Sequence, residues 1–201
     1  IMSSDWSSDV CSSDLGAVVL IMDPLQVIET FYPPGSETHA ILVNHSRQVA
    51  KKSLEIARSL ALPDLDPDFI EQAAMLHDIG IFMTASPGIG CTGDAPYICH
   101  GYLGRELLDK EGLDPAFGLV AERHTGAGIC LDTIRRHNLP LPRRNMVPIT
   151  LAEKIICCAD KFYSKTAQNL HRTVPDIIAE LSAIDPAHGL RFSRWANVFH
   201  L

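Results

Sequence analysis

One stretch constrains the fold of this chain more than any other, the segment that reads Glu-Gln-Ala-Ala-Met-Leu-His-Asp-Ile-Gly from Glu71 to Gly80. The apolar positions before and within it follow the i, i+3, i+4, i+7 spacing of a helix face, and they are Ile70, Ala73, Ala74 and His77. The buried face of this helix is therefore expected to end in an imidazole, followed directly by the carboxylate of Asp78. Gly80 is predicted to stop the helix, because glycine adopts the left-handed conformation at little cost.

His77 and Asp78 form a polar pair at the buried end of the predicted helix. Buried polar groups without partners are costly, so this pair needs something to bind. A metal ion would satisfy both side chains, since a neutral imidazole and a carboxylate are common metal ligands. A core histidine next to a capping aspartate is the alternative, and the segment on its own does not decide between the two.

Four further polar residues interrupt the apolar stripes of other predicted helices at spacings of three or four residues. They are His45 (with Val49, Ile56 and Leu60), His100 (with Leu103, Gly104, Leu107 and Leu108), His124 (with Phe117, Val120 and Ala121) and Asp160 (with Ile156 and Tyr163). Packing alone explains this pattern poorly, because separate buried histidines would each need a separate partner. One shared metal site would satisfy all of them.

The order of these residues resembles the HD-domain superfamily of metal-dependent phosphohydrolases. The tetrapeptide His77-Asp78-Ile79-Gly80 is similar to the signature of that superfamily, and the Cys99-His100-Gly101 and His124-Thr125-Gly126 segments extend the likeness. The resemblance spans roughly residues 37–165. It implies an all-α, single-domain helical bundle that binds one or two metal ions.

Imidazole and carboxylate ligands without thiolates suit divalent Fe, Mn, Ni, Co or Zn. Six ligands are more than one ion needs if water and substrate also bind, so we expect two ions. In this assignment one ion takes His45, His77 and Asp160, the other takes His100 and His124, and Asp78 bridges them. The superfamily contains one-metal and two-metal members, and His100 and His124 place this chain with the latter.

Cations near the metal ligands are candidates for neutralising phosphoryl oxygens. We expect Lys161 and Arg123 to act in catalysis together with Asp78, because each cation is adjacent in sequence to a ligand. The residues expected to bind the substrate are Thr125, Lys165, Arg143 and Arg144. The alternative for each cation is a solvated surface charge, the commoner fate of lysine and arginine.

The expected function is hydrolysis of a phosphoester or phosphoanhydride, in a nucleotide, by a metal-bound hydroxide. The contexts of His100 and His124 are locally similar to those of HD-type diadenosine tetraphosphate hydrolases. Two alternatives remain. Some HD-fold enzymes use the same ligand pattern to hold two irons and oxidise a small diol or phosphonate, and a non-catalytic ligand-binding module is also compatible with the fold.

The domain organisation is expected to be simple. Residues 1–21 repeat a Ser-Ser-Asp unit and are interpreted as a non-native extension, whereas 22–201 form one domain. Helices are predicted at 24–31, 38–60, 67–78, 96–111, 115–124, 132–137, 150–160, 175–183 and 186–199, with an irregular loop at 84–96.

The formal charge of −7 argues against a broad nucleic-acid or anionic-membrane surface. Without a long apolar run or a C-x-x-C pair, we expect a cytoplasmic protein with reduced cysteines.

Overall fold

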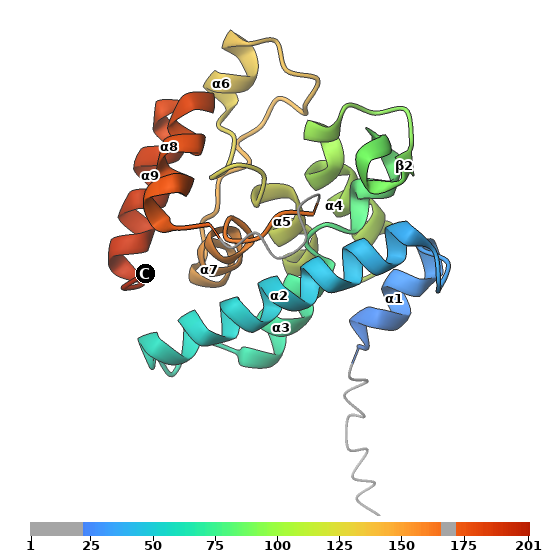
Figure 1. The fold of residues 1–201 in the computed structure, drawn as a ribbon, viewed down its shortest axis with the longest axis horizontal. Coiled ribbons are helices and arrows are strands. Elements are labelled where there is room, and N and C mark those ends of the chain that lie inside the picture. The colour runs from blue at the N-terminus through green and yellow to red at the C-terminus, as the bar shows by residue number, and fades with distance from the viewer. Residues whose placement is uncertain (1–21, 166–171) are drawn as a thin grey trace, which may run out of the picture.

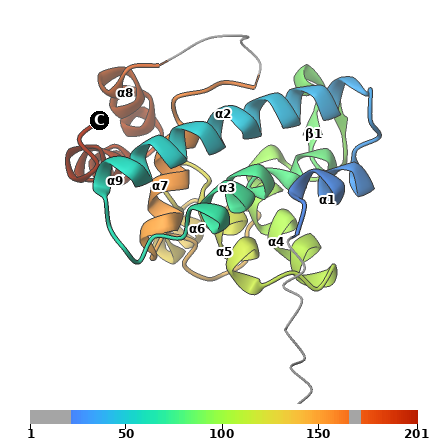
Figure 2. The ribbon, with the colours of Figure 1, turned by 90° about the horizontal axis from the view of Figure 1, so that it is seen from below.

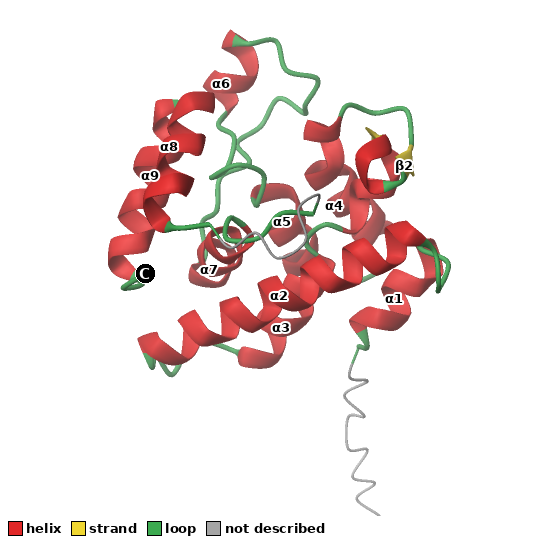
Figure 3. Cartoon of the chain, in the orientation of Figure 1, coloured by secondary structure: helices red, strands yellow, loops and turns green. Residues whose placement is uncertain are grey.

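The computed structural model describes residues 22–165 and 172–201, so the predicted non-native segment 1–21 lies outside the described residues. The described part consists of helices joined by loops, with one short two-stranded ladder (Figure 3). This confirms the predicted all-α, single-domain bundle. The α-helices are α1 (Pro24–Phe31), α2 (Glu37–Leu60), α3 (Pro67–Leu76), α4 (His100–Lys110), α5 (Pro115–Arg123), α6 (Leu131–Arg136), α7 (Leu151–Asp160), α8 (Val174–Ile184) and α9 (Pro186–Val198).

Local sequence signals account for where the central helices begin. Asp66 caps α3 by accepting hydrogen bonds from the backbone N–H groups of Asp68 and Phe69, at 3.0 and 3.2 Å. Thr150 caps α7 in the same way through the N–H of Glu153, at 3.1 Å. Each cap satisfies donors that have no partner within the helix, and it fixes the register of the ligand at the far end of that helix.

Helix α2 lies across α3 and α7 and organises the core (Figure 2). These three helices contribute buried residues to one core, which are Leu42, Val49 and Ile56 from α2, Ile70, Ala73 and Ala74 from α3, and Ile155 and Ile156 from α7. Helices α8 and α9 pack side by side at the end of the bundle and contact α7 through α9 (Figure 1). No helix in the described ranges is both long and apolar enough to cross a membrane.

The loop predicted as irregular, residues 84–96, contains some regular structure. Two short strands, β1 (Ala85–Ser86) and β2 (Cys91–Thr92), pair antiparallel around the 3₁₀ turn η2 (Pro87–Ile89). The prediction of a wholly irregular loop was therefore wrong. A further 3₁₀ turn, η3 (Tyr97–Cys99), leads into α4, so α4 begins later than its predicted start at residue 96.

Gly80 has a different role from the predicted one. Helix α3 ends at Leu76, and Gly80 lies in the 3₁₀ segment η1 (Ile79–Met83) with a negative φ. The left-handed stop was therefore wrong. Glycine is required there for space, because a Cβ atom would lie 2.2 Å from the carbonyl oxygen of His100 and 2.5 Å from the backbone nitrogen of Gly104. The absence of a side chain lets α4 approach the segment that follows Asp78.

Replacing Gly80 with alanine should therefore lower the free energy of unfolding by about 1–3 kcal/mol, the usual cost of overpacking a core. The added methyl group meets backbone atoms, which cannot rotate away. Urea unfolding measures the effect. Gly88→Ala is the matched control, since a Cβ there meets nothing within 4 Å and should change stability little. Equal stability of the two variants would show that α4 can move aside freely.

Candidate metal centre

Six predicted ligands meet in the interior, and every one of them is buried. They are His45 in α2, His77 and Asp78 directly after α3, His100 at the start of α4, His124 directly after α5 and Asp160 at the end of α7. They form two groups in which the ligand atoms lie within 4.8 Å of one another. The helices that the sequence analysis treated separately therefore converge on one place.

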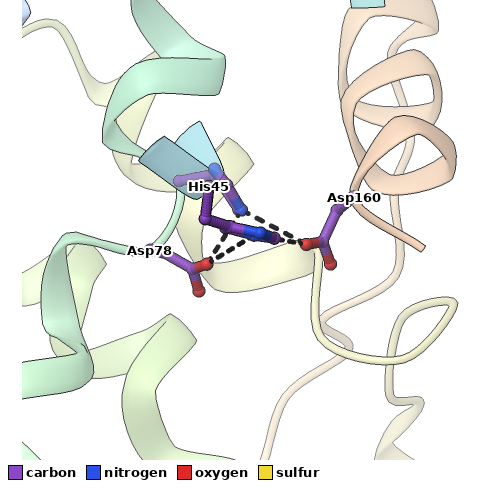
Figure 4. A group of neighbouring side chains, drawn as sticks. His45, Asp78 and Asp160 are labelled. Atoms are coloured by element: carbon purple, nitrogen blue, oxygen red, sulfur yellow. Dashed lines mark hydrogen bonds and ion pairs between the residues drawn. The ribbon is translucent and has the colours of Figure 1, made fainter. Parts of the chain in front are cut away.

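The first group consists of His45, His77, Asp78 and Asp160. Nε2 of His45 lies 2.9 Å from Oδ1 of Asp160 and 3.1 Å from Oδ2 of Asp78 (Figure 4). Nε2 of His77 lies 3.0 Å from the same Asp78 oxygen and 3.5 Å from Oδ1 of Asp160. Two imidazoles and two carboxylates thus direct their ligand atoms at one point.

The second group consists of Asp78, His100 and His124. The Nε2 atoms of the two histidines are 3.0 Å apart. They lie 3.5 and 3.3 Å, respectively, from Oδ1 of Asp78. Asp78 therefore presents one oxygen to each group, which is the arrangement of a bridging carboxylate.

Backbone carbonyls set the orientation of three of the four imidazoles. Nδ1 of His77, His100 and His124 lies 2.6, 2.6 and 2.7 Å from the carbonyl oxygen three residues earlier. A carbonyl only accepts, so each Nδ1 carries the hydrogen, and in a neutral ring Nε2 keeps its lone pair. The lone pairs of His100 and His124 then face each other, which is unfavourable unless a cation or a proton lies between them.

The charges in the interior also favour a bound cation. Burial would raise the pKa of Asp78, but the charge of His77 and the other cations hold it well below its usual range, so the carboxylate is ionised. Burial lowers the pKa of His100 to about 3 and keeps that ring neutral. Burial would lower the pKa of His77 too, but Asp78 and Asp160 raise it to about 9, so the two carboxylates stabilise positive charge at this point.

The residues present fit a pair of divalent transition-metal ions. Nε2 of His77 and both carboxylate oxygens of Asp78 make no hydrogen bond of normal geometry with any described residue, although they lie close to oppositely charged groups. Buried polar atoms in this state are rare in folded proteins and call for a ligand. Neutral imidazoles oriented by carbonyls, together with shared carboxylates, are typical of such sites.

A cavity of about 520 Å³ opens beside both groups. Its wall includes His100, His124 and Asp160, so a molecule in the cavity would contact the candidate ligands. The other residues that line it are Ser86, Gly88, Ile89, Tyr97, Thr125, Gly126, Lys161, Tyr163, Ser164, Lys165 and Arg172. The size is that of a typical small-molecule site.

Two predicted cations, Lys161 and Lys165, lie at the junction of the cavity and the ligand groups. Nζ of Lys161 is 2.5 Å from Oδ2 of Asp160, and Nζ of Lys165 is 2.6 Å from Oδ2 of Asp78. Burial opposes both charges, but the facing carboxylates raise the pKa of each lysine, so both remain protonated. Thr125, also predicted to bind the substrate, lines the same cavity.

The predicted arginines lie elsewhere. Arg123 pairs through Nη1 with both carboxylate oxygens of Glu153, at 2.9 and 3.0 Å. Arg144 donates through Nε to Glu122 at 2.6 Å, and Arg143 is exposed. None of the three lines the cavity. Buried Glu122 and Glu153 require cationic partners, which gives Arg123 and Arg144 a structural role. The catalytic role of Arg123 and the substrate-binding role of Arg144 stay predictions.

Among the cavity residues that sequence reasoning missed, Arg172 and Tyr97 matter most for the chemistry. Arg172 contributes a third cation, which also pairs through Nη1 with Glu180 at 3.2 Å. Its backbone N–H donates to the carbonyl of Phe162 at 3.2 Å, next to Lys161. The ring of Tyr97 stacks on His100 with the centroids 4.6 Å apart. Arg172 has no signal in the sequence because it lies far from any motif. Tyr97 could have been found from the sequence, because an aromatic residue three positions before His100 lies close to that ligand on a helical turn.

Comparison with known proteins identifies the family of this chain. The HD-domain family profile matches residues 42–164, which include all six candidate ligands. Since that is more than half of the chain, the chain belongs to the HD-domain family. An uncharacterized protein of Methanocaldococcus jannaschii is 34% identical over 121 residues, which cover 59% of this chain and 64% of that protein.

Two further relatives are tRNA (cytidine(56)-2'-O)-methyltransferases. The protein of Thermoplasma volcanium is 30% identical over 147 residues, covering 73% of this chain, and that of Picrophilus torridus is 32% identical over 124 residues, covering 62%. The chain spans only 38% and 32% of these two proteins, and their names describe the whole proteins.

Solved structures agree on the fold. The HD domain of the L. monocytogenes phosphodiesterase PgpH superposes with a TM-score of 0.54 at 14% identity, covering 88% of this chain and 94% of that domain. The same domain in complex with cyclic-di-AMP gives a TM-score of 0.53 at 15% identity, covering 89% of this chain and 94% of the domain.

Proposed function

We propose that this protein is a metal-dependent phosphohydrolase that cleaves a phosphoester or phosphoanhydride of a nucleotide. The observation that carries the proposal is the bridging position of Asp78, with one oxygen in each of two buried ligand groups beside a cationic cavity. His45, His77 and Asp160 would complete one site, and His100 and His124 the other. Bound divalent ions would supply Lewis acidity and lower the pKa of a coordinated water.

The residues around the cavity would hold and orient the phosphoryl group. Lys161, Lys165 and Arg172 offer three cations for its oxygens as negative charge develops. Thr125 offers a hydroxyl donor on the wall next to His124. In hydrolysis a water oxygen forms the new bond to phosphorus, and the bond from phosphorus to the leaving oxygen breaks.

Three observations support a nucleotide as the substrate. The ring of Tyr97 lines the cavity with 38% of its residue surface exposed, and aromatic faces of this kind stack on nucleobases. An HD domain of the same fold has been crystallised with cyclic-di-AMP. The cavity volume of about 520 Å³ is sufficient for more than a phosphate group.

The proposal is tested by loading the metal-free protein anaerobically with Mn²⁺, Co²⁺, Fe²⁺ or Zn²⁺ and measuring hydrolysis. The substrates are p-nitrophenyl phosphate, nucleoside mono-, di- and triphosphates, a cyclic dinucleotide and a dinucleoside polyphosphate. Metal-dependent product release from a nucleotide is expected. Oxygen consumption by the iron-loaded protein with a diol or phosphonate, and no hydrolysis, would replace the proposal by the oxygenase alternative. Metal binding with neither activity would favour the binding module.

Lys161→Ala should lower turnover on the order of 10²-fold, the usual effect of removing one charge-stabilising donor from an active site. Metal content should stay unchanged, because all six ligands remain. Turnover and metal analysis on the same preparation give the two values. Lys154→Ala is the matched control, since this residue lies on α7, which ends just before Lys161, but outside the cavity. Wild-type turnover in the Lys161 variant would remove this lysine from the mechanism.

A further inference from the structure

The cavity wall next to His124 is a tight turn, residues Thr125 to Gly128. The N–H of Gly128 donates to the carbonyl of Thr125 at 2.9 Å, and Gly126 and Gly128 both have positive φ angles, 61° and 84°. Thr125 and Gly126 face the cavity. Apart from the buried methyl group of Ala127, this turn has little side-chain packing of its own, so its position depends largely on the groups that bind its backbone.

Helix α9 holds this turn from one side. Arg191 donates through Nε to the carbonyl of Ala127 at 2.8 Å and through Nη2 to the carbonyl of Gly128 at 2.5 Å. Two donors of one planar guanidinium thus bind two successive carbonyls, which fixes orientation as well as distance.

One turn of α9 earlier, His188 packs against the same segment. It is 5% exposed, and neither of its ring nitrogens has a hydrogen-bond partner among the described residues. A methyl group on Gly126 would lie 2.7 Å from its Nδ1, so ring and glycine are in close contact. Burying an imidazole without partners is unfavourable. We interpret His188 as a packing residue whose ring fills the space behind the turn.

Helix α7 holds the turn from the other side. The thiol of Cys157 donates to the carbonyls of His124 and Gly126, at 3.3 and 3.5 Å. The segment that begins at His124 is therefore clamped between α7, which carries Asp160, and α9. Helix α7 lies within the range matched by the HD-domain family, residues 42–164, whereas α9 lies outside it.

We propose that Arg191, supported by His188, is a positioning residue for the second metal group, acting through the turn that follows His124. The inference rests on the proposed metal centre. Loss of the two Arg191 hydrogen bonds would let the turn shift and would move His124 relative to His100 and Asp78. Arg191 forms its hydrogen bonds with the turn and not with the first group. Metal binding by that group, which consists of His45, His77, Asp78 and Asp160, should therefore be unaffected.

The test is a calorimetric titration of the metal-free full chain with Mn²⁺ or Co²⁺, which measures the affinity for each ion. Arg191→Ala should lower the affinity of the second group for its ion about tenfold. This is the lower end of the effect of removing a residue that supports a metal ligand. The affinity of the first ion should stay the same. Arg191→Lys keeps the charge and one donor, and it should recover part of the lost affinity. This readout does not require any hydrolytic activity, so it is independent of the proposed reaction.

Arg194→Ala is the matched control, since this exposed arginine of the same helix forms no hydrogen bond with residues 125–128. It should bind both ions as the wild type does. A purely structural role of Arg191 would lower the melting temperature and weaken both ions equally, and that result would overturn the proposal. Unchanged affinity for both ions in Arg191→Ala would overturn it as well. If the alanine variant does not fold, Arg191→Lys decides between the same outcomes.

Discussion

Replacing Asp78 with alanine is expected to remove both metal ions and to lower turnover by about 10³-fold or more, given what single charge-stabilising groups contribute. The reason is geometric. Oδ2 of Asp78 lies within 3.1 Å of Nε2 of His45 and His77, and Oδ1 lies 3.3 Å from Nε2 of His124. One side chain therefore serves both groups, and its loss also removes a negative charge that offsets the ions. Elemental analysis and turnover on the same sample give both quantities.

Asp78→Asn sharpens this experiment because it keeps the size of the side chain. The amide retains one weak oxygen ligand and loses the charge, so it should bind no more than one ion, and weakly. Asp64→Ala, in the exposed turn between α2 and α3, is the control for general effects of losing a carboxylate. Normal metal content and turnover in Asp78→Ala would show that the bridging assignment is wrong.

The burial of the candidate ligands was predictable because of a conflict within single helices. His45, His100 and Asp160 interrupt apolar stripes that would otherwise face the core, and the structure buries all three. Local periodicity is enough to detect such a conflict, because burial of a helix face follows from its pattern. The starts of α3 and α7 were also predictable, since Asp66 and Thr150 are strong capping residues and act as caps.

The roles of the cations and of Gly80 were less predictable because they depend on packing between helices. Lys161 and Arg123 are both adjacent in sequence to a candidate ligand, yet Lys161 lines the cavity and Arg123 pairs with Glu153 on another helix. Successive residues of a helix point about 100° apart, so adjacency in sequence does not fix direction. Gly80 likewise owes its role to α4, which no local pattern reveals.

Replacing His124 with alanine should remove one ion and leave the other. The second group would keep only His100 and Oδ1 of Asp78, whereas all four residues of the first group remain. Two protein ligands are fewer than a stable site for these metals usually has. We expect metal content to fall from two ions per chain to one and turnover to fall about 10²-fold, since two ions normally share the attacking and leaving oxygens.

The result separates a two-metal centre from a single site with extra histidines. His137→Ala is the matched control, because this histidine is exposed after α6 and lies in neither ligand group. It should retain two ions and full turnover. Loss of both ions on His124→Ala would mean that the two groups fill only together. A wild-type protein that binds one ion, which His124→Ala leaves in place, would contradict the second site, and His124 would then belong to the wall of the cavity.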